Sequence, residues 1–150
     1  NYGYLYTPRS FSIVAMKDNS IMHEKREVKQ IIYGECCSKA NSRRLVHFGG
    51  KPRFIKSKKA LVFERDVQIQ AKKISPMLEG DLKIEVDIYY SSRRPDLDES
   101  IILDALQGIW YANDRAFKHK TIRKFLDKEN PRCEVTVTEI DWDEKKPPTN

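Results

Sequence analysis

The chain has 150 residues, of which 39% are hydrophobic and 33% are charged, so the sequence predicts one folded domain with a modest core and excludes a disordered chain. No apolar run approaches the roughly 18 residues that a membrane span needs, and no secretory signal peptide is visible, so we expect a cytoplasmic protein with no membrane partner. The net charge of +6 favours a polyanionic partner, because Lys and Arg contacts to phosphate groups release condensed counterions.

The N-terminal half is predicted to hold one strand, one loop and one helix. Residues 1–27 are expected to be an extension of unclear role. A strand is expected over residues 28–37, followed by a loop over residues 38–57 that contains turn-forming Gly and Pro residues. Apolar residues at helical spacing predict a helix over residues 58–74, and Ser57 is placed to cap its start.

The C-terminal half is predicted to hold three strands and a second helix. Strict alternation of apolar and polar residues makes the strand over residues 81–90 the clearest element. The other predicted elements are a helix over 98–110, strands over 116–126 and 132–140, and a flexible tail over 142–150. The order β-α-β-α-β-β predicts an α/β (α+β) domain over residues 28–141, with a small mixed sheet and two helices packed on it.

The three cysteines, Cys36, Cys37 and Cys133, are interpreted as packing thiols. Their number is odd and two are adjacent, so no disulfide framework is indicated. The three histidines do not have the spacing of a structural zinc site either.

Two carboxylates stand two residues apart in the segment Arg93-Arg94-Pro95-Asp96-Leu97-Asp98, between a predicted strand and a predicted helix. Residues i and i+2 of an extended segment point the same way, so Asp96 and Asp98 are candidates to converge on one point. A third acid, Asp114, lies in a polar turn after the helix. Three convergent carboxylates repel one another unless they surround a hard cation such as Mg²⁺, so they form a candidate metal site.

Other interpretations of these acids stay open. Asp98 is also placed to cap the helix. In this interpretation Asp96 is a solvated neighbour, and Asp114 ends a turn. A calcium loop of the EF-hand type is disfavoured, because its sixth position is Ile101 instead of Gly.

Positive charge is concentrated between Ser38 and Phe63, where no acidic residue occurs. This segment carries Lys39, Arg43, Arg44, Lys51, Arg53, Lys56, Lys58 and Lys59. A basic loop that leads into a basic helix start is typical of a phosphate-binding surface, although a solvated loop is the alternative.

Several motifs together resemble the RusA Holliday junction resolvases. They are Arg93–Asp98 (RRPDLD), Ile102–Gly108 (ILDALQG) and Tyr111–Arg115 (YANDR), with Tyr33-Gly34 and Arg43-Arg44 upstream. The resemblance covers about residues 28–140. It implies a bacterial or phage-encoded, Mg²⁺-dependent homodimer, with Mn²⁺ as a possible substitute, that cuts four-way DNA junctions during recombination and repair.

The resemblance also implies roles for individual residues. Asp96, Asp98 and Asp114 match the metal-binding catalytic aspartates, while Asp104 matches a helical aspartate with a supporting role. The basic residues expected to contact DNA are Lys39, Arg43, Arg44, Lys51, Arg53, Arg93 and Arg94. Two departures stand out: Glu99 replaces an Asn, and Ile102 replaces a lysine that serves catalysis, for which Lys118 or Lys120 is a candidate substitute.

Three functions are therefore compared. The first is an active structure-selective endonuclease, and the second is a non-catalytic module, derived from such an enzyme, that binds branched DNA. The third is a restriction-like nuclease, because Pro95-Asp96 and Asp143-Glu144-Lys145 imitate its sequence pattern.

Overall fold

The computed structural model describes residues 11–12, 24–38 and 43–147. Its main sheet has five strands in the order β1-β2-β7-β5-β6. Their bounds are Phe11–Ser12 (β1), Lys25–Tyr33 (β2), Arg132–Ile140 (β7), Asp81–Tyr90 (β5) and Phe117–Leu126 (β6). β5 and β6 are parallel and the other neighbours are antiparallel, which confirms the predicted mixed sheet.

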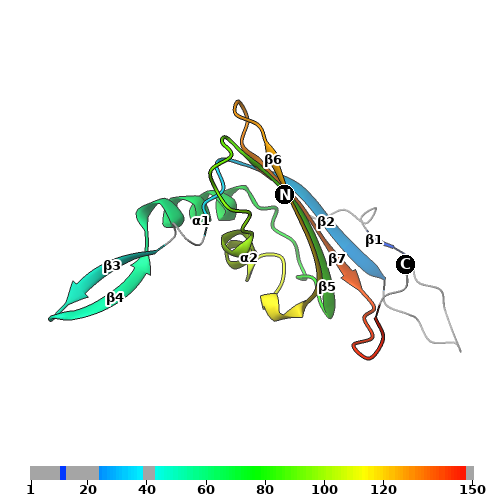
Figure 1. Cartoon of the computed structure of the whole chain (residues 1–150). Helices are drawn as coiled ribbons and strands as arrows, with labels where there is room; N and C mark the ends of the chain where they lie inside the picture. Colours follow the sequence, from blue (N-terminus) through cyan, green and yellow to red (C-terminus); the bar gives the residue numbers. More distant parts are fainter. Residues whose placement is uncertain (1–10, 13–23, 39–42, 148–150) are drawn as a thin grey trace, which may run out of the picture.

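Two helices, α1 (Lys58–Gln70) and α2 (Ser100–Leu106), lie on the same side of this sheet (Figure 1). The side chains of β5 that face them are apolar and fully buried: Leu82, Ile84, Val86, Ile88 and Tyr90. This alternation explains why the strand was predictable, since one side of the sheet forms the core and the other stays polar. In the described part of the chain, no helix is long and apolar enough to cross a membrane.

The opposite side of the sheet carries charges that compensate one another. Arg123 forms two bonds to the carboxylate of Asp87, at 2.7 and 2.8 Å. Arg132 bonds Glu134 at 3.0 Å, and its guanidinium lies 3.8 Å from the centre of the Tyr89 ring.

Both helices are shorter than predicted. Ser57 caps α1 as expected, accepting a bond from the amide of Ala60 at 3.1 Å. The helix ends at Gln70, whose side-chain amide bonds both the N–H and the C=O of Tyr33 at 2.8 Å. α2 ends at Leu106, because Gly108 adopts a φ of 88° and its N–H bonds the carbonyl of Tyr111 at 2.7 Å. The first long strand, predicted over 28–37, instead ends at Tyr33 before Gly34, whose φ is 122°.

The loop predicted over residues 38–57 is wrong in its larger part. Residues 43–56 form a two-stranded hairpin of β3 (Arg43–Phe48) and β4 (Lys51–Lys56), which stands clear of the sheet in Figure 1. Its turn has positive φ angles at both Gly49 (55°) and Gly50 (80°). That combination is what a tight two-residue hairpin turn requires, and glycine adopts it without steric cost.

Candidate active site and nucleic-acid interface

The two first candidate acids lie in a segment that we name the acid loop, Ser91–Glu99. After β5 ends, this loop runs back beside β6: Lys124 donates to the carbonyl of Pro95 at 2.5 Å, and Lys120 lies 3.4 Å from the Glu99 carboxylate. In the parallel register, Lys124 lies opposite Ile88 and Lys120 opposite Ile84. The loop therefore returns about four residues along the sheet, on the side that the helices cover.

The buried hydroxyl of Tyr90 holds the backbone between the two acids. It donates to the carbonyl of Asp96 at 3.1 Å and accepts from the amide of Asp98 at 3.3 Å. Burial raises the pKa of this hydroxyl, so Tyr90 keeps its proton and remains a donor.

The two acids differ in their surroundings. The side chain of Asp96 is exposed. Asp98 is half-buried, and its Oδ1 accepts a bond from the amide of Ser100 at 2.9 Å, at the start of α2. Asp98 therefore closes a turn one residue before the cap of α2, Glu99, whose own side chain makes no capping bond.

Asp114 lies on the other side of α2, in the short 3₁₀ turn Asp114–Ala116 that leads into β6. Its amide donates to the side-chain oxygen of Gln107 at 3.0 Å. Burial raises the pKa of the Tyr111 hydroxyl, and the charges of Asp114 and Asp104 raise it further, so both acids lie near that ring. The Tyr111 hydroxyl donates to the carbonyl of Leu103 in α2 at 2.6 Å, so Asp114 lies near α2, on the helix-covered side of the sheet.

The candidate acids have these neighbours among the described contacts. The charge of Asp98 contributes to the raised pKa values of the Cys36 and Cys37 thiols, and the charges of Asp114 and Asp104 contribute to that of Tyr111. Within the described ranges, no three or more His, Cys, Asp and Glu side chains are placed to hold a metal ion. The oxygen donors of Asp96, Asp98 and Asp114 suit Mg²⁺ in their chemistry, and their joint coordination stays a prediction.

The two candidate lysines have different ion-pair partners. Lys120 pairs with Glu99 in the acid loop, while Lys118 pairs with Glu144 at 2.5 Å, near the C-terminal end of the described chain. That contact is the main cause of the raised pKa of Lys118. The structure therefore brings Lys120, and not Lys118, to the acid loop.

The candidate DNA-contacting residues lie at two places. Arg44, Lys51 and Arg53 are exposed on the hairpin, and Arg93 and Arg94 are exposed in the acid loop. Lys39 lies outside the described residues, and Arg43 is placed only as the first residue of β3.

The start of the basic region lies beside the acid loop. A small hollow separates residues 35–38 from the acid loop, and Lys59 of α1 lines it too. Two contacts connect its walls: both oxygens of the Glu35 carboxylate accept from the amide of Ser91 at 3.2 and 3.3 Å, and the Sγ of Cys36 lies 3.8 Å from the carbonyl of Asp98. Residues 35–38 and Lys59 of α1 therefore lie beside the acid loop.

A comparison with models of protein families shows which family the chain belongs to. The model of the endodeoxyribonuclease RusA matches residues 34–138. The chain belongs to the RusA endodeoxyribonuclease family. No curated protein was found to match it. The RusA match includes the hairpin, the acid loop and Asp114, so the two candidate surfaces both lie inside the family's domain.

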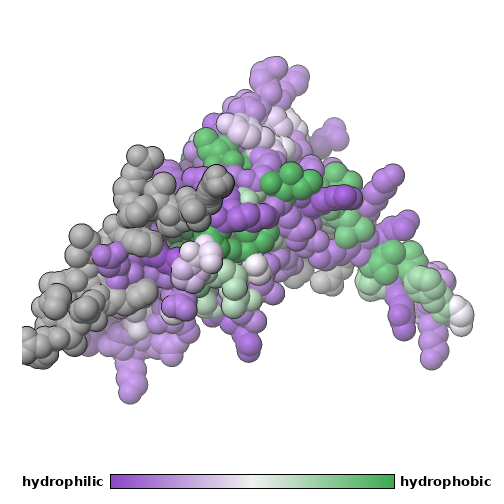
Figure 2. Space-filling model, turned by 180° about the vertical axis from the view of Figure 1, so that it is seen from behind, coloured by the Kyte–Doolittle hydropathy of each residue, from purple (hydrophilic) through white to green (hydrophobic). Residues whose placement is uncertain are grey.

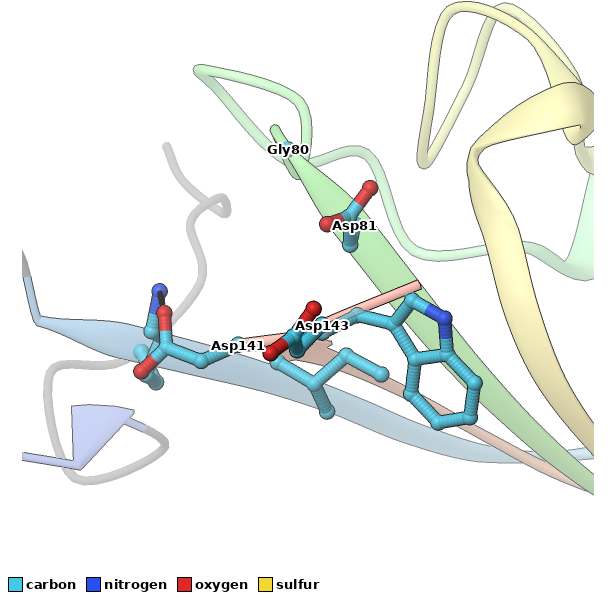
Figure 3. A pocket seen from close by; sticks show the side chains of 7 residues that line it. Gly80, Asp81, Asp141 and Asp143 are labelled. Carbon is cyan, nitrogen blue, oxygen red and sulfur yellow. Dashed lines mark ion pairs between the residues drawn. The ribbon is translucent and has the colours of Figure 1, made fainter. Parts of the chain in front are cut away.

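A second acidic hollow lies mostly outside the RusA match. Asp81, Asp141 and Asp143 surround it where β5 begins and β7 ends (Figure 3). Asp141 pairs with Lys25 at 2.9 Å. The Asp143-Glu144-Lys145 segment lies after the end of β7, in a turn and not in a strand. This placement disfavours the restriction-like nuclease, whose sequence pattern needs these residues on a strand of the sheet.

Sequence reasoning missed Tyr90, Lys124 and Glu35, which fix the acid loop of this RusA-family protein. The alternation of apolar and polar residues in β5 predicted Tyr90 only as a core residue, and not as a residue that holds the acid loop. The contacts of Lys124 and Glu35 depend on the parallel pairing of β5 with β6 and on the path of the chain after β2, for which the sequence has no local pattern.

Proposed function

We propose that this protein is a Mg²⁺-dependent endonuclease that resolves four-way DNA junctions as a homodimer, in recombination and repair in a bacterial or phage-infected cell. The observation that carries the proposal is the RusA match, which spans the acid loop and Asp114. A two-fold symmetric junction suits a two-fold symmetric enzyme. Mn²⁺ is the expected substitute ion, since it accepts the same oxygen ligands.

Asp96, Asp98 and Asp114 are the residues proposed to hold the ion. When bound, Mg²⁺ supplies Lewis-acid stabilisation of the phosphate and lowers the pKa of a water molecule. Tyr90 and Lys124 keep the backbone of the acid loop in place through their bonds to Asp96, Asp98 and Pro95. The exposed guanidinium groups of the acid loop are placed to bind phosphates on either side of the cut bond.

Lys120 is proposed to take the part of the lysine that the resemblance places at position 102. Ile102 is fully buried in the core, so a side chain there does not face the acid loop. Lys120 reaches the loop from β6 through Glu99. Its ammonium is then available to stabilise negative charge that develops on the phosphate.

The alternative is a binding module without cleavage activity, which Ile102 in place of the family's lysine favours. A synthetic four-way junction, incubated with the protein and Mg²⁺, distinguishes the two. The proposal expects paired nicks at symmetrical positions in opposing strands, because each subunit of a dimer cuts one strand. Tight binding without any nick, in Mg²⁺ or Mn²⁺, would establish the binding module.

The role of Lys120 is tested by Lys120→Met, with Lys118→Met as the matched control on the same strand. Loss of the Lys120 charge is expected to slow cleavage about a hundred-fold with little change in junction affinity. Single-turnover rates and filter binding separate the two effects. Equal rates for the two variants, or loss of rate in Lys118→Met alone, would remove Lys120 from the site.

A further inference from the structure

The β3–β4 hairpin exposes large apolar side chains that nothing in the described chain covers. Leu45, Phe48 and Phe54 are exposed to 51%, 59% and 72%. The β3–β4 hairpin projects from the body as an arm (Figure 1). This arm, at the right of Figure 2, shows apolar surface beside hydrophilic side chains. A two-stranded hairpin with this exposure is marginal in water alone, so an occupant of the arm is expected.

The register of the hairpin places basic residues beside apolar ones. Leu45 pairs with Phe54, and His47 pairs with Pro52, two residues nearer the turn. Since side chains alternate along a strand, these four residues share one face. The opposite face carries Arg44, Lys51 and Arg53 together with Val46, Phe48 and Ile55, and the register places Lys56, which pairs with Arg43, on the first face. Apolar and basic residues are therefore mixed on both faces of the hairpin.

The arm is fixed in direction at its base. Ser57 follows β4 directly and caps α1, and Lys56 bonds the carboxylate of Glu64 at 2.8 Å. Its other end connects, through residues 39–42, to the segment that contacts the acid loop. The arm therefore extends outward from the start of α1, which holds its base.

The positive charge of the arm indicates which class of molecule binds it. No acidic residue occurs from Ser38 to Phe63, so phosphates fit the basic side chains of the hairpin. Phosphates leave its exposed apolar side chains unexplained. A nucleic acid presents flat apolar surface only where base stacking is interrupted, because a continuous duplex buries the faces of its bases. Basic and exposed apolar side chains on one arm together fit a branch point better than a plain duplex.

We propose that the β3–β4 hairpin is a wedge that reads branched DNA: Phe54 and Leu45 pack against unstacked bases at the branch point while Arg44, Lys51 and Arg53 bind the adjoining phosphates. This inference rests on the proposed junction-cutting function and assigns its structure selectivity to the arm. In this proposal the hairpin determines which DNA structure is bound, and the acid loop carries out the cleavage.

The test measures binding of the full chain to a four-way junction and to a duplex of the same sequence, in the absence of Mg²⁺. Phe54→Ala is expected to weaken junction binding roughly ten-fold and leave duplex binding unchanged, because one stacking contact is lost. Phe54→Trp is expected to restore the preference. Lys51→Ala is expected to weaken both DNAs equally and reduce the salt dependence of binding. Ile69→Ala, which removes an apolar side chain of α1 that is 71% exposed, is the matched control and is expected to bind as wild type.

A second readout is the fluorescence of 2-aminopurine placed at the branch point. Wild type is expected to change the signal, and Phe54→Ala is expected not to. An unchanged junction preference in Phe54→Ala would overturn the wedge while leaving the proposed function standing. Wild type that does not distinguish junction from duplex would count against the proposed function itself. A wild-type dimer that becomes monomeric in Phe54→Ala would overturn the wedge in favour of a second copy of this chain as the occupant.

Discussion

Replacing Asp98 with Asn is expected to abolish junction cleavage and to leave junction binding intact. The substitution removes one negative charge from the proposed site and keeps an oxygen that accepts the Ser100 amide, so the start of α2 retains its bond. Loss of a charged ligand to a hard cation is expected to slow cleavage on the order of a thousand-fold or more.

Single-turnover cleavage in Mg²⁺, with junction affinity measured in parallel, provides the check. Asp81→Asn is the matched control, because Asp81 lies in the other acidic hollow and is expected to cut as wild type does. If Asp98→Asn cuts at the wild-type rate, Asp98 has no part in the reaction. If Asp81→Asn alone is inactive, the site lies at the beginning of β5.

Replacing Arg26 with Met is expected to destabilise the fold by about 3–5 kcal/mol, since it leaves the buried Glu139 carboxylate without its charge partner. Glu139 is 2% exposed and also accepts the amides of Arg26 and Glu79, at 2.9 and 2.8 Å. The guanidinium further bonds the carbonyls of Pro76 and Met77. One ion pair thus connects β2, β7 and the segment before β5.

Urea unfolding measures this effect as a fall in the free energy of unfolding. Lys25→Met is the matched control, because the neighbouring Lys25 pairs with Asp141, which is 87% exposed, and such a surface pair contributes at most about 1 kcal/mol. The double change Arg26→Met with Glu139→Leu is expected to recover part of the loss, since both buried charges are gone. A loss in Arg26→Met no larger than in Lys25→Met would contradict the account.

The sheet was the most predictable part of the molecule. β5 and β7 have the bounds expected from the sequence, 81–90 and 132–140, because alternating burial leaves a direct pattern. The hairpin was missed for the opposite reason: it has no buried face, so its exposed basic and aromatic residues resembled those of a loop. The Gly49-Gly50 pair was its one local signal, and it indicated a hairpin turn as much as a loop turn.

The candidate site was predictable in its residues and not in its arrangement. The spacing of Asp96 and Asp98 marked the acid loop, and the order of elements placed Asp114 after the next helix. The return of the loop along β6 depends on Lys124 and Lys120, which are four residues apart and so share one side of the strand. It also depends on the parallel pairing that places β6 beside β5. The ends of the helices depended on long-range bonds such as that of Gln70 with Tyr33, which no local periodicity encodes.

The central claim is that the acids on both sides of α2 hold one ion beside DNA. Crystals of the wild-type protein with junction DNA and Mn²⁺ test it directly, because the anomalous signal of Mn²⁺ locates the ion without assumptions about the protein. We expect the ion between the carboxylates of Asp98 and Asp114, next to a phosphate of the junction. Mn²⁺ found only among Asp81, Asp141 and Asp143, or Asp98 and Asp114 too far apart to share one ion with DNA bound, would contradict the claim.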